Sequence, residues 1–96
     1  MSEAFDKAVE SVRERVQGSD VQGSYRFVIE DEGVIMIRDG AVSTEDGEAD
    51  VTVKADLDTF REMFDGSLSP ASAFMTGRVD VEGDMSQAMQ LSALVG

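Results

Sequence analysis

The sequence contains no cysteine, no histidine and no tryptophan. These absences exclude disulfides, thiolate nucleophiles, zinc sites built from Cys and His, and histidine general bases. An enzyme of this composition would have to use carboxylates, lysine, tyrosine or hydroxyl groups, and no pair of acids stands in a distinctive catalytic motif. The only tyrosine, Tyr25, has no candidate base near it in sequence. We therefore expect a protein that is not an enzyme and that uses no cofactor.

Basic residues are also few, because 8 Lys and Arg stand against 20 Asp and Glu, which gives a net charge of −12. Phosphate backbones and anionic membrane surfaces would be repelled, so we expect no nucleic-acid partner and no stable membrane insertion. The only lysines are Lys7 and Lys54. An acid-rich, lysine-poor composition is typical of halophilic proteins, and adaptation to a salty solvent is a second explanation of the charge.

Long apolar runs are absent, and none approaches the ~18 residues of a membrane-spanning helix. The first residues show neither a basic region followed by an apolar one nor the features of a transit peptide. We therefore expect a cytoplasmic protein. A chain of 96 residues has the length of one domain, so we expect a single domain over residues 1–96. The acidic loop at residues 45–50 lacks the spacing of a calcium loop, and we expect a solvated turn and no metal site there.

Hydrophobic periodicity predicts nine elements in this chain. Apolar side chains at helical spacing predict helices over residues 3–17, 57–65, 71–76 and 85–95, and β-branched or alternating runs predict strands over 25–30, 34–38, 41–44, 50–55 and 78–82. Asp39-Gly40 predicts a tight type I′ hairpin, because both central positions need a positive φ. Asp56 and Asp84 are predicted helix N-caps, and Gly66 a helix stop. The order of elements predicts an α+β fold with two layers, in which helices pack on one face of a five-stranded, mostly antiparallel sheet.

The second half of the chain carries glycine, proline and apolar positions in one register over about forty residues. The run comprises Ala49-Asp50-Val51-Thr52-Val53, Gly66, Leu68, Pro70, Ala73-Phe74-Met75, Gly77-Arg78-Val79, Val81, Gly83-Asp84-Met85, Ala88-Met89 and Leu91. In these residues the chain resembles the sterol carrier protein type 2 family. About half of the sequence carries the motif, and the order of elements in the rest fits the family.

The resemblance implies an apolar tunnel between sheet and helices that binds a fatty acid, a fatty acyl-CoA, a sterol-like lipid or an isoprenoid. Mapped onto this sequence, the tunnel lining would comprise Phe60, Met63, Phe64, Leu68, Phe74, Met75, Met85 and Met89. Arg78 would be a headgroup contact, since guanidinium pairs with carboxylates and phosphates, although a surface ion pair is the simpler role for it. The chain ends at Leu94-Val95-Gly96 without the C-terminal extension and peroxisomal address of animal members, which favours a prokaryotic source.

Two interpretations of the apolar residues stay open at this stage. Methionine adapts to ligands of varied shape, but Met36, Met63, Met75, Met85 and Met89 also suit the gaps of an ordinary core. If five bulky residues filled the space, the chain would be a protein-interaction or accessory domain without a ligand; these are Phe60, Phe64, Phe74, Met85 and Met89. The oligomeric state and the identity of the lipid are not indicated by the sequence.

Overall fold

The computed structural model describes residues 3–18 and 21–95, with side chains through residue 90. Its elements are α1 (Glu3–Gln17), β1 (Ser24–Ile29), β2 (Gly33–Arg38), β3 (Ala41–Ser43), β4 (Val51–Ala55), α2 (Leu57–Asp65), α3 (Pro70–Met75), β5 (Val79–Gly83) and α4 (Met85–Val95). All nine predicted elements are present. The boundaries differ by one residue at several ends. Helix α3, for example, begins at Pro70 itself, where proline is tolerated because the N–H groups of the first turn have no acceptor within the helix.

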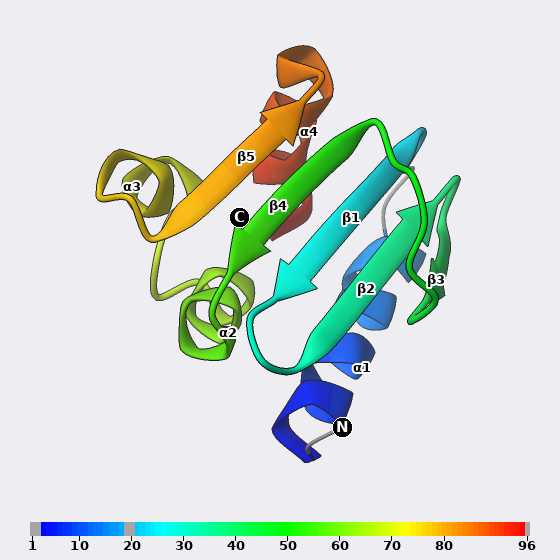
Figure 1. Ribbon diagram of the computed structural model, residues 1–96, viewed down its shortest axis with the longest axis horizontal. Helices are drawn as coiled ribbons and strands as arrows, with labels where there is room; N and C mark the ends of the chain where they lie inside the picture. Colours follow the sequence, from blue (N-terminus) through cyan, green and yellow to red (C-terminus); the bar gives the residue numbers. More distant parts are fainter. Residues whose placement is uncertain (1–2, 19–20, 96) are drawn as a thin grey trace.

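The five strands form one sheet in the order β3-β2-β1-β4-β5 (Figure 1). Three of the neighbouring pairs are antiparallel, and β1 and β4 run parallel with Phe27 opposite Val53. The hairpin between β2 and β3 is built as expected, since Asp39 and Gly40 both have positive φ, 48° and 87°. The predicted fold class is confirmed: the sheet is mostly antiparallel, with one parallel pair at its centre.

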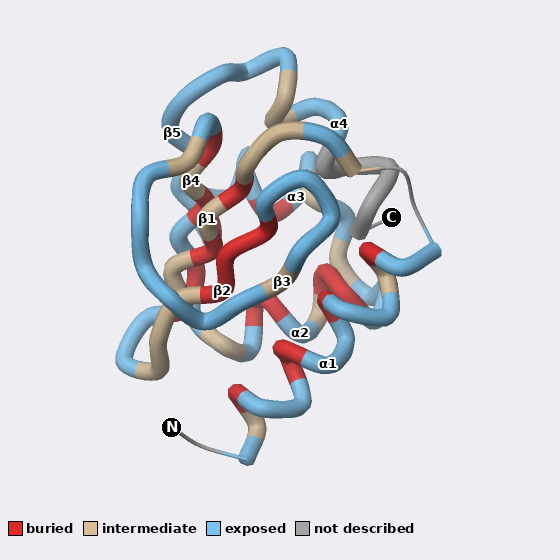
Figure 2. Tube along the Cα trace, turned by 90° about the vertical axis from the view of Figure 1, so that its right-hand side faces the viewer, coloured by how far each residue is buried: buried red, intermediate tan, exposed pale blue. Residues whose placement is uncertain are grey.

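The helices lie on one side of the sheet, and the buried positions gather between the two layers (Figure 2). Helix α1 contributes the apolar face that its spacing predicts, burying Phe5, Ala8, Val9, Val12 and Val16. Strand β4 alternates as expected and turns its two valines and Ala55 inward. Rings from the sheet and from α2 meet in the middle of this core, where Phe60 lies 5.3 Å from Phe27 and 4.6 Å from Phe64 between ring centroids.

Both ends of α2 carry the predicted caps. The Asp56 carboxylate accepts a hydrogen bond from the Thr59 backbone N–H at 2.7 Å, and Gly66 ends the helix in the left-handed conformation at φ 89°. The corner between β5 and α4 is similarly defined, because Asp84 accepts hydrogen bonds from the backbone N–H groups of Ser86 and Gln87. These caps fix the direction in which α2 and α4 leave the sheet.

Candidate functional site

An apolar pocket of about 310 Å³ opens where β5 forms the edge of the sheet. Strands β1, β4 and β5 provide one side of it, and helices α2, α3 and α4 provide the other. All eleven lining side chains are apolar: Phe27, Val53, Met63, Pro70, Ala71, Phe74, Val79, Val81, Met85, Ala88 and Met89. The volume lies at the lower end of the range of about 300–1,000 Å³ that small-molecule sites occupy.

The pocket has a buried floor and an exposed rim. Phe27, Val53, Met63 and Val79 form the floor and are each at most 5% exposed. The rim consists of Phe74 on α3 and of Met85 and Met89 on α4, whose exposed fractions are 52%, 54% and 75%. Large apolar side chains are seldom left this open together without a partner, and such patches commonly mark a binding site.

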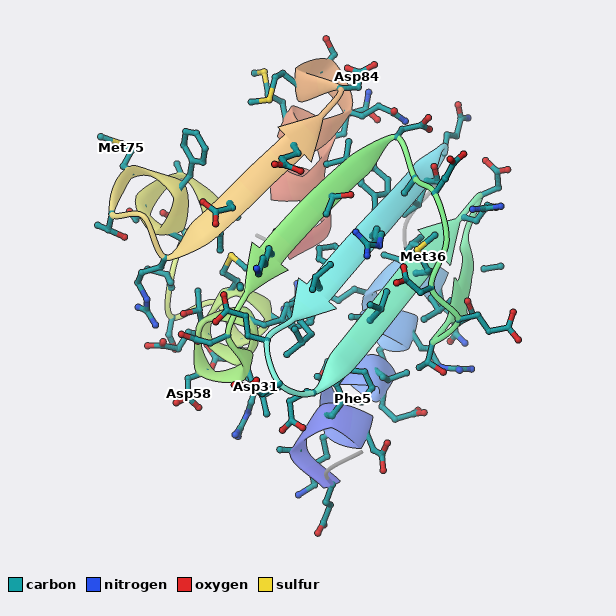
Figure 3. The ribbon with its side chains drawn as sticks, viewed as in Figure 1. Phe5, Asp31, Met36, Asp58, Met75 and Asp84 are labelled. Atoms are coloured by element: carbon teal, nitrogen blue, oxygen red, sulfur yellow. The ribbon has the colours of Figure 1, made fainter. Side chains whose placement is uncertain are left out.

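The structure brings together four of the eight residues predicted to line a tunnel: Met63, Phe74, Met85 and Met89. Met75 lies on the outer side of α3, away from β5, and is 84% exposed (Figure 3). Its neighbour Phe74 takes the place at the pocket, since adjacent residues on a helix point in different directions. The expectation that both would line one space does not match the lining.

Phe60, Phe64 and Leu68 also lie outside this lining. Phe60 and Phe64 are core residues, and the parts of their surface that reach solvent line a second, more polar depression between α1 and α2 together with Lys7 and Arg61. Leu68 is partly buried against the core. These three side chains therefore belong to the core that stabilises the fold or pack against it, and they do not line the pocket.

Seven lining residues were not predicted: Phe27, Val53, Pro70, Ala71, Val79, Val81 and Ala88. A signal for some of them is present in the sequence. Val79 and Val81 alternate with acidic residues along β5, and Ala88 follows Met85 by one helical turn, so the same faces that predicted the fold contain them. The predicted lining consisted mostly of aromatic and sulfur-containing residues, whereas small aliphatic side chains form much of the pocket wall in the structure.

Arg78 holds an ion pair, the simpler of the two roles considered for it. Its Nη2 lies 2.5 Å from the Glu62 carboxylate, and its Nε donates to the Thr59 hydroxyl at 3.2 Å. Arg78 is not among the residues that line the pocket. The guanidinium therefore ties the start of β5 to α2.

Tyr25 ties the sheet to α4 at the other end of the site. Its side chain is 2% exposed, and its hydroxyl donates to the backbone carbonyl of Gln87 at 3.3 Å. Burial raises the pKa of Tyr25, and the nearby carboxylates of Asp50 and Asp84 raise it further. A neutral, hydrogen-bonded phenol suits a structural contact between β1 and α4.

Among the described residues, no group of three or more acidic side chains is arranged to hold a metal ion. None of the described helices is both long enough and apolar enough to cross a membrane.

The family model of the SCP-2 sterol transfer family matches residues 3–96. The chain belongs to this family. Among curated relatives, Hydroxysteroid dehydrogenase-like protein 2 of Xenopus tropicalis is 34% identical over 104 residues, which cover all of this chain and 25% of the relative. The protein of the same name in Danio rerio is 37% identical over 82 residues, covering 77% of this chain and 20% of the relative. The chain thus spans a quarter or less of the length of these relatives.

Solved structures of other family members share the fold. Sterol Carrier Protein 2 Like 2 from Aedes aegypti superimposes with a TM-score of 0.81 at 20% identity, covering 94% of each chain. Sterol Carrier Protein-2 from Aedes aegypti in complex with the C16 fatty acid palmitate gives a TM-score of 0.81 at 18% identity, covering 100% of this chain and 97% of the other. The resemblance to sterol carrier proteins seen in the sequence is confirmed.

Proposed function

We propose that the chain binds an apolar lipid in the pocket beside β5 and carries it by reversible burial, without catalysing a reaction. The observation that carries this proposal is the all-apolar lining with a buried floor and an exposed rim. Fatty acids, fatty acyl-CoAs, sterol-like lipids and isoprenoids are the ligand classes considered. The family description and the palmitate held by the mosquito relative support a lipid over other apolar molecules.

Burial of the tail supplies enough free energy for useful binding. Each buried CH₂ contributes about 0.8 kcal/mol, so a sixteen-carbon tail offers a gross contribution of about 13 kcal/mol if all of it is covered. Lost translational freedom and chain ordering offset about 4–15 kcal/mol. A pocket of about 310 Å³ that is open at the rim covers only part of such a tail. We therefore expect micromolar rather than picomolar binding, with release fast enough for a carrier.

Native mass spectrometry of the purified chain, followed by titration with a fluorescent fatty acid, tests the proposal. We expect a co-purifying lipid mass, or saturable uptake with one site per chain after delipidation. A bare mass together with no saturable uptake by a folded, delipidated chain contradicts it. The test variant is Ala88→Phe, which fills part of the pocket from α4 and should strongly weaken uptake while keeping the fold.

A protein-interaction or accessory role is the second candidate, and one observation favours it. Met75 is 84% exposed and faces away from the pocket, so a lipid in the pocket would leave it uncovered. Substituting Met75→Ser separates the two functions, because it should leave lipid uptake unchanged and weaken only a contact with another protein.

We also propose that residues 1–96 fold as one independent domain that works in the cytoplasm. The core is continuous from α1 to β5, which supports the first part. A single cooperative unfolding transition of the isolated chain is the expected result, and two separated transitions would contradict it. Cell fractionation tests the second part.

A further inference from the structure

Among the residues whose side chains the structure describes, none that lines the pocket is charged or polar, so these residues offer no partner for a charged headgroup. The N-terminus of α4, which begins at the lining residue Met85, would be the natural place for a carboxylate. That position is already taken, because the Asp84 carboxylate accepts the N–H groups of Ser86 and Gln87 at 2.9 and 3.2 Å.

The cations of the chain are engaged elsewhere. Four of them form ion pairs: Lys7 with Glu3, Arg13 with Glu10, Arg26 with Asp46, and Arg78 with Glu62. Arg15 and Arg38 donate to the backbone carbonyls of Phe64 and Glu48. Arg61 lines the depression between α1 and α2, on the other side of α2 from the floor residue Met63.

Lys54 is the remaining cation, and it belongs to the opposite face of the sheet. It is exposed and lies opposite Asp80 in the register of β4 and β5. The depression on that face contains Lys54 and Arg26 together with Asp80 and Glu82, so its charges balance, and it borders the pocket at Phe74 and Val81. Since the whole chain carries a net charge of −12, an anionic headgroup at the rim would be repelled at long range, and no described lining residue supplies a compensating charge.

We propose that the pocket selects uncharged lipids, such as alcohols, esters, sterols or free isoprenoids, over the anions of fatty acids. The inference rests on the proposed lipid-binding function and specifies the headgroup class for the same site. An uncharged hydroxyl at the rim can keep its hydrogen bonds to water, so its placement there costs no desolvation free energy. A carboxylate at the rim is repelled by the net charge of the chain and gains no ion pair from the lining residues.

Dodecanol and dodecanoate form a suitable pair of probes, because they share a twelve-carbon chain, dissolve at micromolar concentration and differ in the charge of the head. Each is used, below its solubility limit, to displace the uncharged fluorophore N-phenyl-1-naphthylamine at about pH 8 and about 0.01 M salt, where the Debye length is about 30 Å. We expect dodecanol to bind at least tenfold tighter than dodecanoate. The ratio should fall towards one at about 1 M salt, where screening reduces the Debye length to about 3 Å.

A cation placed at the rim should reduce the preference. Ala71 is exposed and lines the pocket on α3, so Ala71→Lys brings an ammonium group to the mouth. Ser43→Lys changes the net charge equally but lies on β3, at the far edge of the sheet from β5. Ala71→Gln controls for the longer side chain. We expect dodecanoate affinity to rise at least fivefold in Ala71→Lys, and much less in Ser43→Lys or Ala71→Gln, with little change for dodecanol.

The outcomes separate this inference from the function on which it rests. If neither probe displaces the fluorophore from folded protein, the lipid-binding function itself fails. If dodecanoate binds as tightly as dodecanol at low salt, lipid binding stands and the headgroup selection is refuted. A preference for dodecanol that is unchanged by salt and by the Ala71→Lys substitution also refutes it, because the preference then does not arise from charge.

Discussion

Ala88 is the position at which the pocket can be closed with the least disturbance to the fold. It lies on α4, is partly exposed, lines the pocket and packs against the core. Replacing it by phenylalanine adds a phenyl ring that can turn into the space that a lipid tail would occupy. If the ring displaces about three methylenes, the binding free energy falls by about 2.4 kcal/mol. This loss corresponds to about a fiftyfold weaker affinity.

Fluorescent fatty-acid titration of Ala88→Phe and wild type measures this loss, with far-UV circular dichroism and thermal unfolding to verify the fold. Ala41→Phe is the matched control, because Ala41 is exposed on β3 and far from the pocket along the sheet. Ala71→Phe approaches the same space from α3 and serves if Ala88→Phe unfolds. A folded Ala88→Phe variant that binds like wild type would show that the lipid lies elsewhere or is not bound.

Three further predictions concern the stability of the fold. Gly83→Ala should destabilise the chain by several kcal/mol in urea unfolding, since a Cβ there would overlap the Asp50 carbonyl at φ 111°, whereas Gly40→Ala, with open space at φ 87°, should cost about 1–2 kcal/mol. Asp56→Ala should cost about 1 kcal/mol through the lost cap, and Asp56→Asn much less. The hydrogen bond from the Thr59 N–H is the main cause of the lowered pKa of Asp56. The cap therefore contributes its full stabilisation above the ordinary carboxyl pKa and loses it as the pH falls through the lowered pKa. Unfolding measured over an acid pH range should show this loss in wild type but not in Asp56→Asn. With a net charge of −12, thermal stability should rise between low and molar KCl, and an unchanged midpoint would contradict the halophilic explanation of the charge.

The local structure was predictable because short-range chemistry determines it. Asp39-Gly40 selects its turn through positive φ, and the caps at Asp56 and Gly66 rest on hydrogen bonds and backbone angles within a few residues. The pairing of β4 with β1 was not predictable in the same way. It joins segments that are about twenty-five residues apart, such as Phe27 and Val53, and alternation along a strand indicates which face is buried but not which neighbour it meets.

The candidate site was predicted only in part, and α2 shows why. Phe60, Met63 and Phe64 share one helical face, and all three are buried as their spacing requires. Helical spacing indicates which residues face the interior, but it does not indicate which neighbouring elements each of them contacts. Met63 turns to β5 and α3, while Phe60 and Phe64 turn to Phe27 and α1. Separating core from pocket therefore needed the tertiary arrangement of three helices around one strand edge.

The exposed rim is the strongest physical reason to regard the pocket as functional. Burying a side chain the size of Phe74, Met85 or Met89 contributes about 1.5–3 kcal/mol, and a domain of this size has only about 5–15 kcal/mol of stability in total. Closing α3 and α4 over β5 would recover much of that contribution, yet the three side chains remain 52–75% exposed. The fold thus forgoes stabilisation at the place where a bound tail would supply it. Under the proposed function, a tail that covers the rim would stabilise the folded chain by mass action, and the apolar surface left open in the free protein would contribute to the binding free energy of the lipid.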